Sequence, residues 1–138
     1  MIRLTLVAAL TLAAQVAWGG TKTWDGKYDT EKIEVTVVYF VPSDRQPLPD
    51  WRERVQYYCG RLELFHAREF QGQSTLTTAI HETPLISERT TAELRRGDAN
   101  AIYFRTLEET DRRLRFAQDK AEREAFPILL VMSDINWR

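Results

Sequence analysis

The sequence has few of the residues that carry chemistry by themselves. Its 138 residues include a single cysteine, Cys59, and two histidines, His66 and His81. One cysteine allows no internal disulfide, so the domain must be stable through its apolar core. Two histidines are fewer than the ligands that a catalytic zinc usually takes. The chain also has no glycine-rich phosphate loop and no nucleophile elbow, which removes two common sequence signals of catalysis.

An excess of charge of one sign is also missing. The 19 basic and 20 acidic residues nearly cancel, and they are mixed along the chain as on an ordinary solvated surface. Nucleic-acid binding needs concentrated positive charge, so this balance predicts no nucleic-acid partner.

Long apolar runs are absent beyond the start of the chain. The opening MIRLTLVAALTLAAQVAWGG has Arg3 as a basic start, an apolar run to about Ala14 and a small-residue site at 17–19. This layout predicts a secretory signal peptide over residues 1–19, and a buried N-terminal helix is the alternative. No other segment approaches the ~20 apolar residues of a membrane helix. We therefore expect a secreted or periplasmic protein without a membrane span after signal removal.

Removing residues 1–19 leaves a chain long enough for one domain of modest core. Arg3 is lost with the signal, which leaves 18 basic and 20 acidic residues. Residues 20–32 are polar and contain the turn signal Asp25-Gly26, so we interpret them as a leader. Residues 33–138 then form a single domain.

The first part of this domain predicts a central strand followed by a long helix. Apolar residues occupy both faces of 33–41, as in a strand covered on both sides, and Pro42 ends it. Asp50 is the expected N-cap, with Glu53 as its capping-box partner, of a helix over 51–70. One stripe of that helix should face the sheet: Trp51, Val55, Tyr58, Leu62 and Phe65.

The rest of the domain alternates between strands and helices. A half-exposed strand is expected over 74–83, and a capping box formed by Thr90 and Glu93 should begin a short helix. A long helix over 98–124 and a closing strand over 128–132 follow. This order predicts an α/β fold with three or more strands in a mixed or partly parallel sheet with packed helices.

The histidines do not match a known zinc-binding helix. The His-Glu-x-x-His motif would need a second histidine where His81-Glu82 is followed by Leu85. The inverted motif near His66 meets Phe70 instead. The two histidines and a carboxylate could still meet in space as a zinc site, although nothing in their spacing demands it. We predict no catalytic, cofactor-binding or metal residue in this chain.

Two Ser-Asp pairs, Ser43-Asp44 and Ser133-Asp134, directly follow predicted strands. Carboxylates at the carboxyl ends of strands can line the ligand crevice of an α/β sheet. They are also common turn and cap residues, so both interpretations stay open.

Three further features have structural interpretations. Arg96-Gly97-Asp98 matches a cell-adhesion tripeptide, but it coincides with a helix stop and the following cap. Cys59 falls on an apolar helix face, which predicts a buried, inert thiol. Trp137 follows the last strand and would be exposed unless more protein covers it.

Two stretches resemble a known family. VTVVYFVPSDRQPLPDWRERVQYYCGRLELFHAREF, residues 35–70, resembles the opening of bacterial secreted, zincin-like metallopeptidase domains, and FPILLVMSDINWR, residues 126–138, resembles their later strand. The resemblance covers most of 33–138 and implies a zincin-like N-terminal subdomain, truncated at its C-terminus. The family's His-Glu-x-x-His helix and third ligand follow this point, so no site residue is carried over. Zinc is expected only in a full-length relative.

Two functional hypotheses follow from these observations. The chain is the non-catalytic N-terminal half of a secreted zinc metallopeptidase, inactive by itself, and the missing half or a partner covers its last strand. The alternative is a small self-contained secreted α/β binding or interaction domain without catalysis. A thiol enzyme using Cys59 is disfavoured because no activating base is evident.

Overall fold

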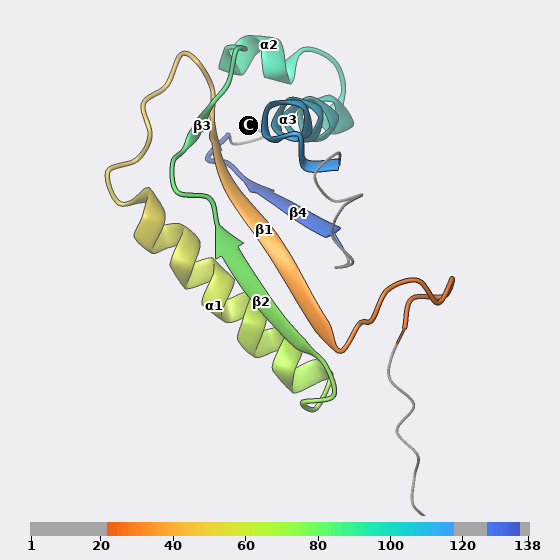
Figure 1. Ribbon diagram of the computed structural model, residues 1–138. Coiled ribbons are helices and arrows are strands. Elements are labelled where there is room, and N and C mark those ends of the chain that lie inside the picture. Colours follow the sequence, from red (N-terminus) through yellow and green to blue (C-terminus); the bar gives the residue numbers. More distant parts are fainter. Residues whose placement is uncertain (1–21, 118–126, 136–138) are drawn as a thin grey trace, which may run out of the picture.

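The fold is a four-stranded parallel sheet between helices. The computed structural model describes residues 22–117 and 127–135, so the predicted signal peptide and Trp137 lie outside the described residues. The elements, in chain order, are β1 (Lys32–Val41), α1 (Trp51–Glu69), β2 (Thr75–Ile80), β3 (Leu85–Ile86), α2 (Thr91–Arg95), α3 (Ala99–Leu114) and β4 (Pro127–Met132). α1 lies on one face of the sheet, and α2 and α3 lie on the other (Figure 1). This arrangement confirms the predicted α/β class.

β1 is the central strand of the sheet. Residues 34–37 of β1 pair in parallel with both β2 and β4, so these two strands flank β1 on opposite edges. Val35, for example, is in register with Thr78 of β2 and with Ile128 of β4. The two-residue strand β3, which the sequence did not predict, pairs in parallel with the last two residues of β1. β1, β2 and β4 therefore run in the same direction, and their carboxyl ends lie at the same end of the sheet.

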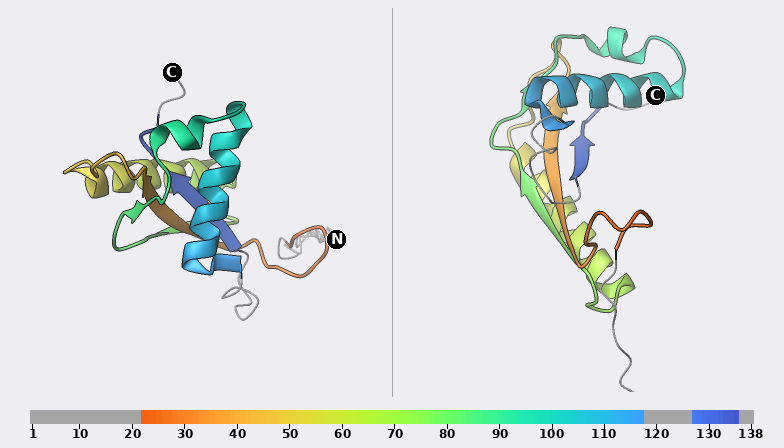
Figure 2. Two further views of the ribbon diagram at one scale, coloured as in Figure 1. Left: turned by 90° about the horizontal axis from the view of Figure 1, so that it is seen from above. Right: turned by 45° about the vertical axis from the view of Figure 1, so that its right-hand side comes forward.

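The side chains of β1 build two separate cores, as predicted from apolar residues on both of its faces. Toward α1, the buried cluster consists of Val35, Val37, Tyr39, Val41, Val55 and Cys59. Toward α2 and α3, it consists of Val38, Phe40, Leu85 and Leu94. Burial on both faces is typical of parallel sheets, and Figure 2 shows the resulting layers from two further sides.

The start of α1 differs from the prediction. The helix begins at Trp51, but the Asp50 side chain forms no cap hydrogen bond, so the predicted capping box with Glu53 is wrong. The Asp50 carboxylate instead accepts a hydrogen bond from Arg54 Nε at 2.8 Å. A charged donor one turn away is a stronger partner than a backbone N–H, and it draws the carboxylate off the helix end.

The buried stripe of α1 is also rotated from the predicted one. Val55, Cys59 and His66 are the buried residues of the helix, with Trp51 packed beside them. Tyr58 and Phe65, which were predicted to face the sheet, are more than half exposed. The helix therefore carries apolar side chains on two faces, and one of them points to solvent.

The α2–α3 region agrees closely with its predicted caps. Thr90 and Glu93 form the expected capping box at the start of α2. Asp98 caps α3 by accepting hydrogen bonds from two backbone N–H groups, and Gly97 has φ +116, which favours glycine. The adhesion-like tripeptide is thus a helix stop and cap. α3 ends at Leu114, before the predicted end, and residues 118–126 lie outside the described chain.

Candidate functional site

A pocket of about 310 Å³ lies where β1 and β4 end beside the start of α1. Ligands of open α/β sheets bind at the carboxyl ends of parallel strands, so this is the position expected for a site. Its walls come from β1, the following loop, α1 and the end of β4, and they consist of Tyr39, Leu48, Trp51, Arg54, Val55, Tyr58, Met132, Ser133 and Asp134.

An aromatic stack forms one wall of the pocket. The rings of Tyr39 and Trp51 lie 5.4 Å apart and nearly parallel, with an interplanar angle of 4°. The Arg52 guanidinium lies 4.8 Å from the centroid of the Trp51 ring, which fixes the indole further. The backbone N–H of Leu48 donates to the Tyr39 hydroxyl at 3.5 Å, and this holds the proline-rich loop against the stack. Burial raises the pKa of Tyr39, so its hydroxyl stays protonated.

Two opposite charges line the same pocket. Arg54 is paired with Asp50, and this hydrogen bond raises the pKa of the guanidinium and lowers the pKa of the carboxyl. The Asp134 carboxylate makes a long ion pair with Arg45, with 3.7 Å between Nη1 and Oδ2, and the same nitrogen donates to the Asp134 backbone carbonyl at 3.3 Å. The pocket therefore presents a cation from α1 and an anion from the end of β4.

One oxygen of Asp134 is left without a partner. Its Oδ1 is buried, and no hydrogen-bond donor reaches it within the described chain. Buried polar atoms in native proteins are nearly always paired, with protein, water or ligand. An unsatisfied carboxylate oxygen in a residue that lines the pocket is therefore the strongest local sign of a binding role.

The other strand-end carboxylate, Asp44, has a structural role. Its Oδ1 accepts hydrogen bonds from the backbone N–H and the hydroxyl of Thr91, both at 2.8 Å. These bonds lower the pKa of Asp44 and tie the loop after β1 to the start of α2. Of the two Ser-Asp pairs singled out in the sequence, the structure places only Ser133-Asp134 in the pocket.

The two histidines are kept apart. His66 Nε2 lies 2.9 Å from Ser74 Oγ, just before β2, whereas His81 Nδ1 lies 2.8 Å from the Thr83 carbonyl, just after it. The whole length of β2 separates them, so the spatial zinc site that the sequence left open is not formed. Within the described residues, no three His, Cys, Asp or Glu side chains come together in a metal-binding group.

The single thiol is sequestered in the core. Cys59 is 3% exposed, and burial raises the pKa of its thiol. This environment confirms the predicted buried position, and because a reactive cysteine needs an accessible thiolate we expect the thiol to be inert.

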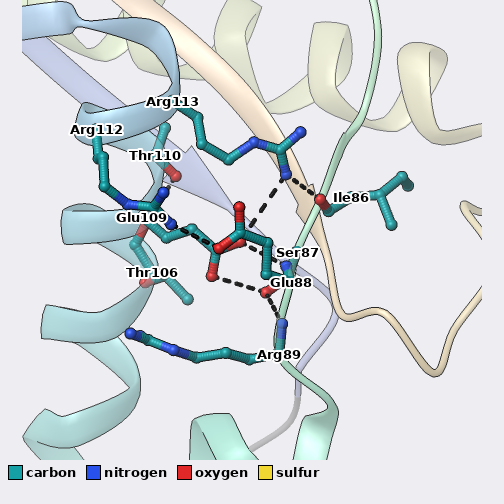
Figure 3. A network of polar contacts seen from close by, with 9 residues as sticks. All are labelled: Ile86, Ser87, Glu88, Arg89, Thr106, Glu109, Thr110, Arg112 and Arg113. Carbon is teal, nitrogen blue, oxygen red and sulfur yellow. Dashed lines mark hydrogen bonds and ion pairs between the residues drawn. The ribbon is translucent and has the colours of Figure 1, made fainter.

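A second polar centre joins α3 to the segment after β3 (Figure 3). Glu109 is 1% exposed, and its carboxylate accepts hydrogen bonds from Ser87 Oγ at 2.8 Å and from the Glu88 backbone N–H at 2.7 Å. Arg113 lies 3.9 Å from the same carboxylate and also donates to the Ile86 carbonyl. Every polar contact here is internal, so this cluster is structural.

Sequence reasoning found two polar residues of the pocket, Ser133 and Asp134, and missed its aromatic wall. Asp134 was singled out by its place after a strand, but Tyr58 was assigned to the core and Arg54 was not considered. The order of parallel strands is what brings these residues together, and it becomes visible only in the fold.

Comparison with protein families, curated proteins and solved structures finds no match to this chain. The resemblance to zincin-like domains therefore rests on the quoted residues alone. None of the described helices is both long enough and apolar enough to cross a membrane.

Proposed function

We propose that this chain is an exported, non-catalytic α/β domain that binds a small zwitterionic ligand in the pocket at the carboxyl ends of β1 and β4. The observation that carries the proposal is the unpartnered, buried Oδ1 of Asp134 in a residue that lines the pocket. This oxygen is inaccessible to solvent in the structure, so a ligand's donor would reach it and satisfy it after rotation of the Asp134 carboxylate.

The pocket's chemistry defines the ligand class. Asp134 suits an ammonium group, Arg54 suits a carboxylate, and the Tyr39–Trp51 stack together with Tyr58 suits an apolar or flat side chain. A free amino acid with an aromatic or other apolar side chain carries all three features. The volume of the pocket agrees with the lower end of the usual range for small-molecule sites.

The environments of the Cys59 thiol and the His66 imidazole support a non-catalytic role. The Cys59 thiol is buried, with its pKa raised by that burial, and His66 is engaged with Ser74 in the core. Neither side chain lines the pocket.

Calorimetric titration with phenylalanine tests the proposal. The protein should bind phenylalanine more tightly than phenethylamine, which lacks the carboxylate, or phenylpropionate, which lacks the ammonium. Asp134→Asn should weaken phenylalanine binding, whereas Lys27→Gln in the exposed leader should leave it unchanged. Equal affinities for all three compounds, or binding of phenylalanine by Asp134→Asn with the wild-type affinity, would contradict the assignment.

The second candidate is the non-catalytic N-terminal half of a secreted zincin-like metallopeptidase. The β1–loop–α1 unit, which carries the more specific part of the resemblance, supports it. Sequencing of the genomic DNA beyond the Arg138 codon is the test. A continued frame with a His-Glu-x-x-His segment would support this candidate, and a clean stop followed by unrelated sequence would count against it. Tight stoichiometric zinc binding by the 138-residue chain would contradict its inactive role.

A further inference from the structure

The outward face of α1 carries a seven-residue repeat. Arginine recurs at Arg54, Arg61 and Arg68, and these positions lie nearly above one another because seven residues make almost two turns. Apolar side chains repeat with the same spacing on both sides of this arginine row: Tyr57 and Leu64 on one side, Tyr58 and Phe65 on the other. We name these seven residues the α1 seam.

The α1 seam is open to solvent. Tyr57 is 61% exposed, Leu64 73%, Tyr58 56% and Phe65 54%. In Figures 1 and 2, α1 lies on the outside of the molecule, with its opposite face against the sheet. A helix that is apolar on both faces is normally buried on both, so a row of exposed aromatic residues marks a surface that a partner covers.

The arginines of the seam hold its aromatic rings in place. Arg61 lies 5.8 Å from the centroid of the Tyr57 ring, and Arg68 lies 5.4 Å from that of Phe65. Arg54 and Arg68 also pair with the exposed acids Asp50 and Glu69, which are weak surface contacts that a partner's carboxylates can replace.

We propose that the α1 seam docks an acidic amphipathic helix of a partner protein. A repeat of seven residues is the pattern that another helix reads by side-chain interdigitation. A lipid surface imposes no such period, and it favours an apolar centre rather than a central row of arginines. In a parallel pairing with a second copy, each arginine would face its own counterpart, which is repulsive. Glutamates on the partner complement the row, which extends over roughly 21 Å. The α1 seam adjoins the pocket and shares Arg54 and Tyr58 with it, whereas Arg61, Arg68, Tyr57, Leu64 and Phe65 lie outside the pocket.

Fluorescence anisotropy with a designed peptide tests the proposal. The probe is a labelled peptide of about three heptads. It has leucine and isoleucine at its core positions and glutamate at the flanking positions, and the repulsion between these glutamates prevents the peptide from pairing with itself. The matched probe has lysine at the same flanking positions. The whole protein should bind the acidic peptide at low salt, more weakly at high salt, and should not bind the basic peptide.

Variants then locate the interaction. Arg61→Glu should weaken binding of the acidic peptide about ten-fold, and Arg61→Lys should weaken it less. Lys27→Glu makes the same change of charge sign in the leader and should have no effect. Equal binding of both peptides, no binding of the acidic peptide, or equal loss with Lys27→Glu would overturn the proposal.

Two other occupants are distinguished in the same series. Self-association that Arg61→Glu changes would show a second copy on the seam. Sedimentation with anionic phosphatidylglycerol vesicles that is lost in Leu64→Ser would show a lipid surface. Either result overturns the acidic helix as the occupant.

Discussion

Glu109 gives the sharpest test of how α3 is held to the rest of the domain. Its buried carboxylate accepts hydrogen bonds from Ser87 Oγ and the Glu88 backbone N–H, and both donors lie before α2, 22 and 21 residues before Glu109 in sequence. Glu109→Ala removes both acceptors and leaves the buried Ser87 hydroxyl with one fewer partner.

The magnitude follows from the two bonds. Each hydrogen bond to a charged group contributes roughly 1.5–3 kcal/mol, but removing a buried carboxylate also relieves its desolvation cost. We therefore expect Glu109→Ala to lower the free energy of unfolding by about 3 kcal/mol. Glu109→Gln keeps the shape and one acceptor oxygen, so it should cost about half as much.

Urea unfolding followed by circular dichroism measures these differences. Glu108→Ala is the matched control, because Glu108 is the exposed neighbour on the same helix and should change stability by less than about 0.5 kcal/mol. If Glu109→Ala unfolds at the same urea concentration as Glu108→Ala, the carboxylate does not hold α3 and the reasoning is refuted.

Four further predictions test the fold and the signal peptide expected from the sequence. Thr90→Ala removes the N-cap of α2 and should lower the free energy of unfolding by about 1 kcal/mol, whereas Thr83→Ala, which is exposed outside any helix, should not. Cys59 should react with a thiol reagent only after denaturant is added, because its thiol is buried and its pKa is raised; complete reaction on mixing with the native protein would contradict this. Hydrogen bonds lower the pKa values of Asp44 and Glu93 in the folded protein. Each carboxylate therefore contributes to the free energy of unfolding at pH values above its pKa in the unfolded chain, and this contribution is lost as the pH falls through its lower pKa in the folded protein. The urea midpoint should thus fall in acid, and Asp44→Asn should make that fall shallower; an unchanged acid limb would refute the assignment. Finally, the exported protein should begin at residue 20, which the intact mass of the secreted or periplasmic product checks.

The elements that the sequence predicts correctly are those marked by apolar runs or by capping residues at fixed local spacing. β1 and β4 follow from apolar runs bounded by proline and polar residues, and the Thr90–Glu93 capping box follows from local spacing. Both signals depend on neighbours in sequence, which is why they were confirmed.

The predictions that were wrong concern features that depend on tertiary contacts. The stripe of α1 was misjudged because the polar His66 takes a buried position, while the aromatic Tyr58 and Phe65 face solvent. The N-cap role of Asp50 lost to an ion pair with Arg54. The buried face of α3 was invisible in the sequence because its members, including Glu109 and Thr110, are residue types typical of surfaces.

Two residues of the candidate site, Ser133 and Asp134, were singled out in the sequence, and the fold brings the other residues to them. Asp134 is identifiable because carboxylates after buried strands belong to the ligand crevice of α/β sheets. Tyr39, Trp51 and Arg54 join it only because β4 returns beside β1 and α1 begins above their ends.

The most direct test of the central claim is an NMR titration of the protein with phenylalanine, observed at the indole N–H of Trp51 and the backbone amide of Asp134. Our account predicts saturable shifts of both resonances, and the shifts should be lost in Asp134→Asn. Saturable binding that leaves both resonances unmoved would contradict a ligand site at the carboxyl ends of β1 and β4.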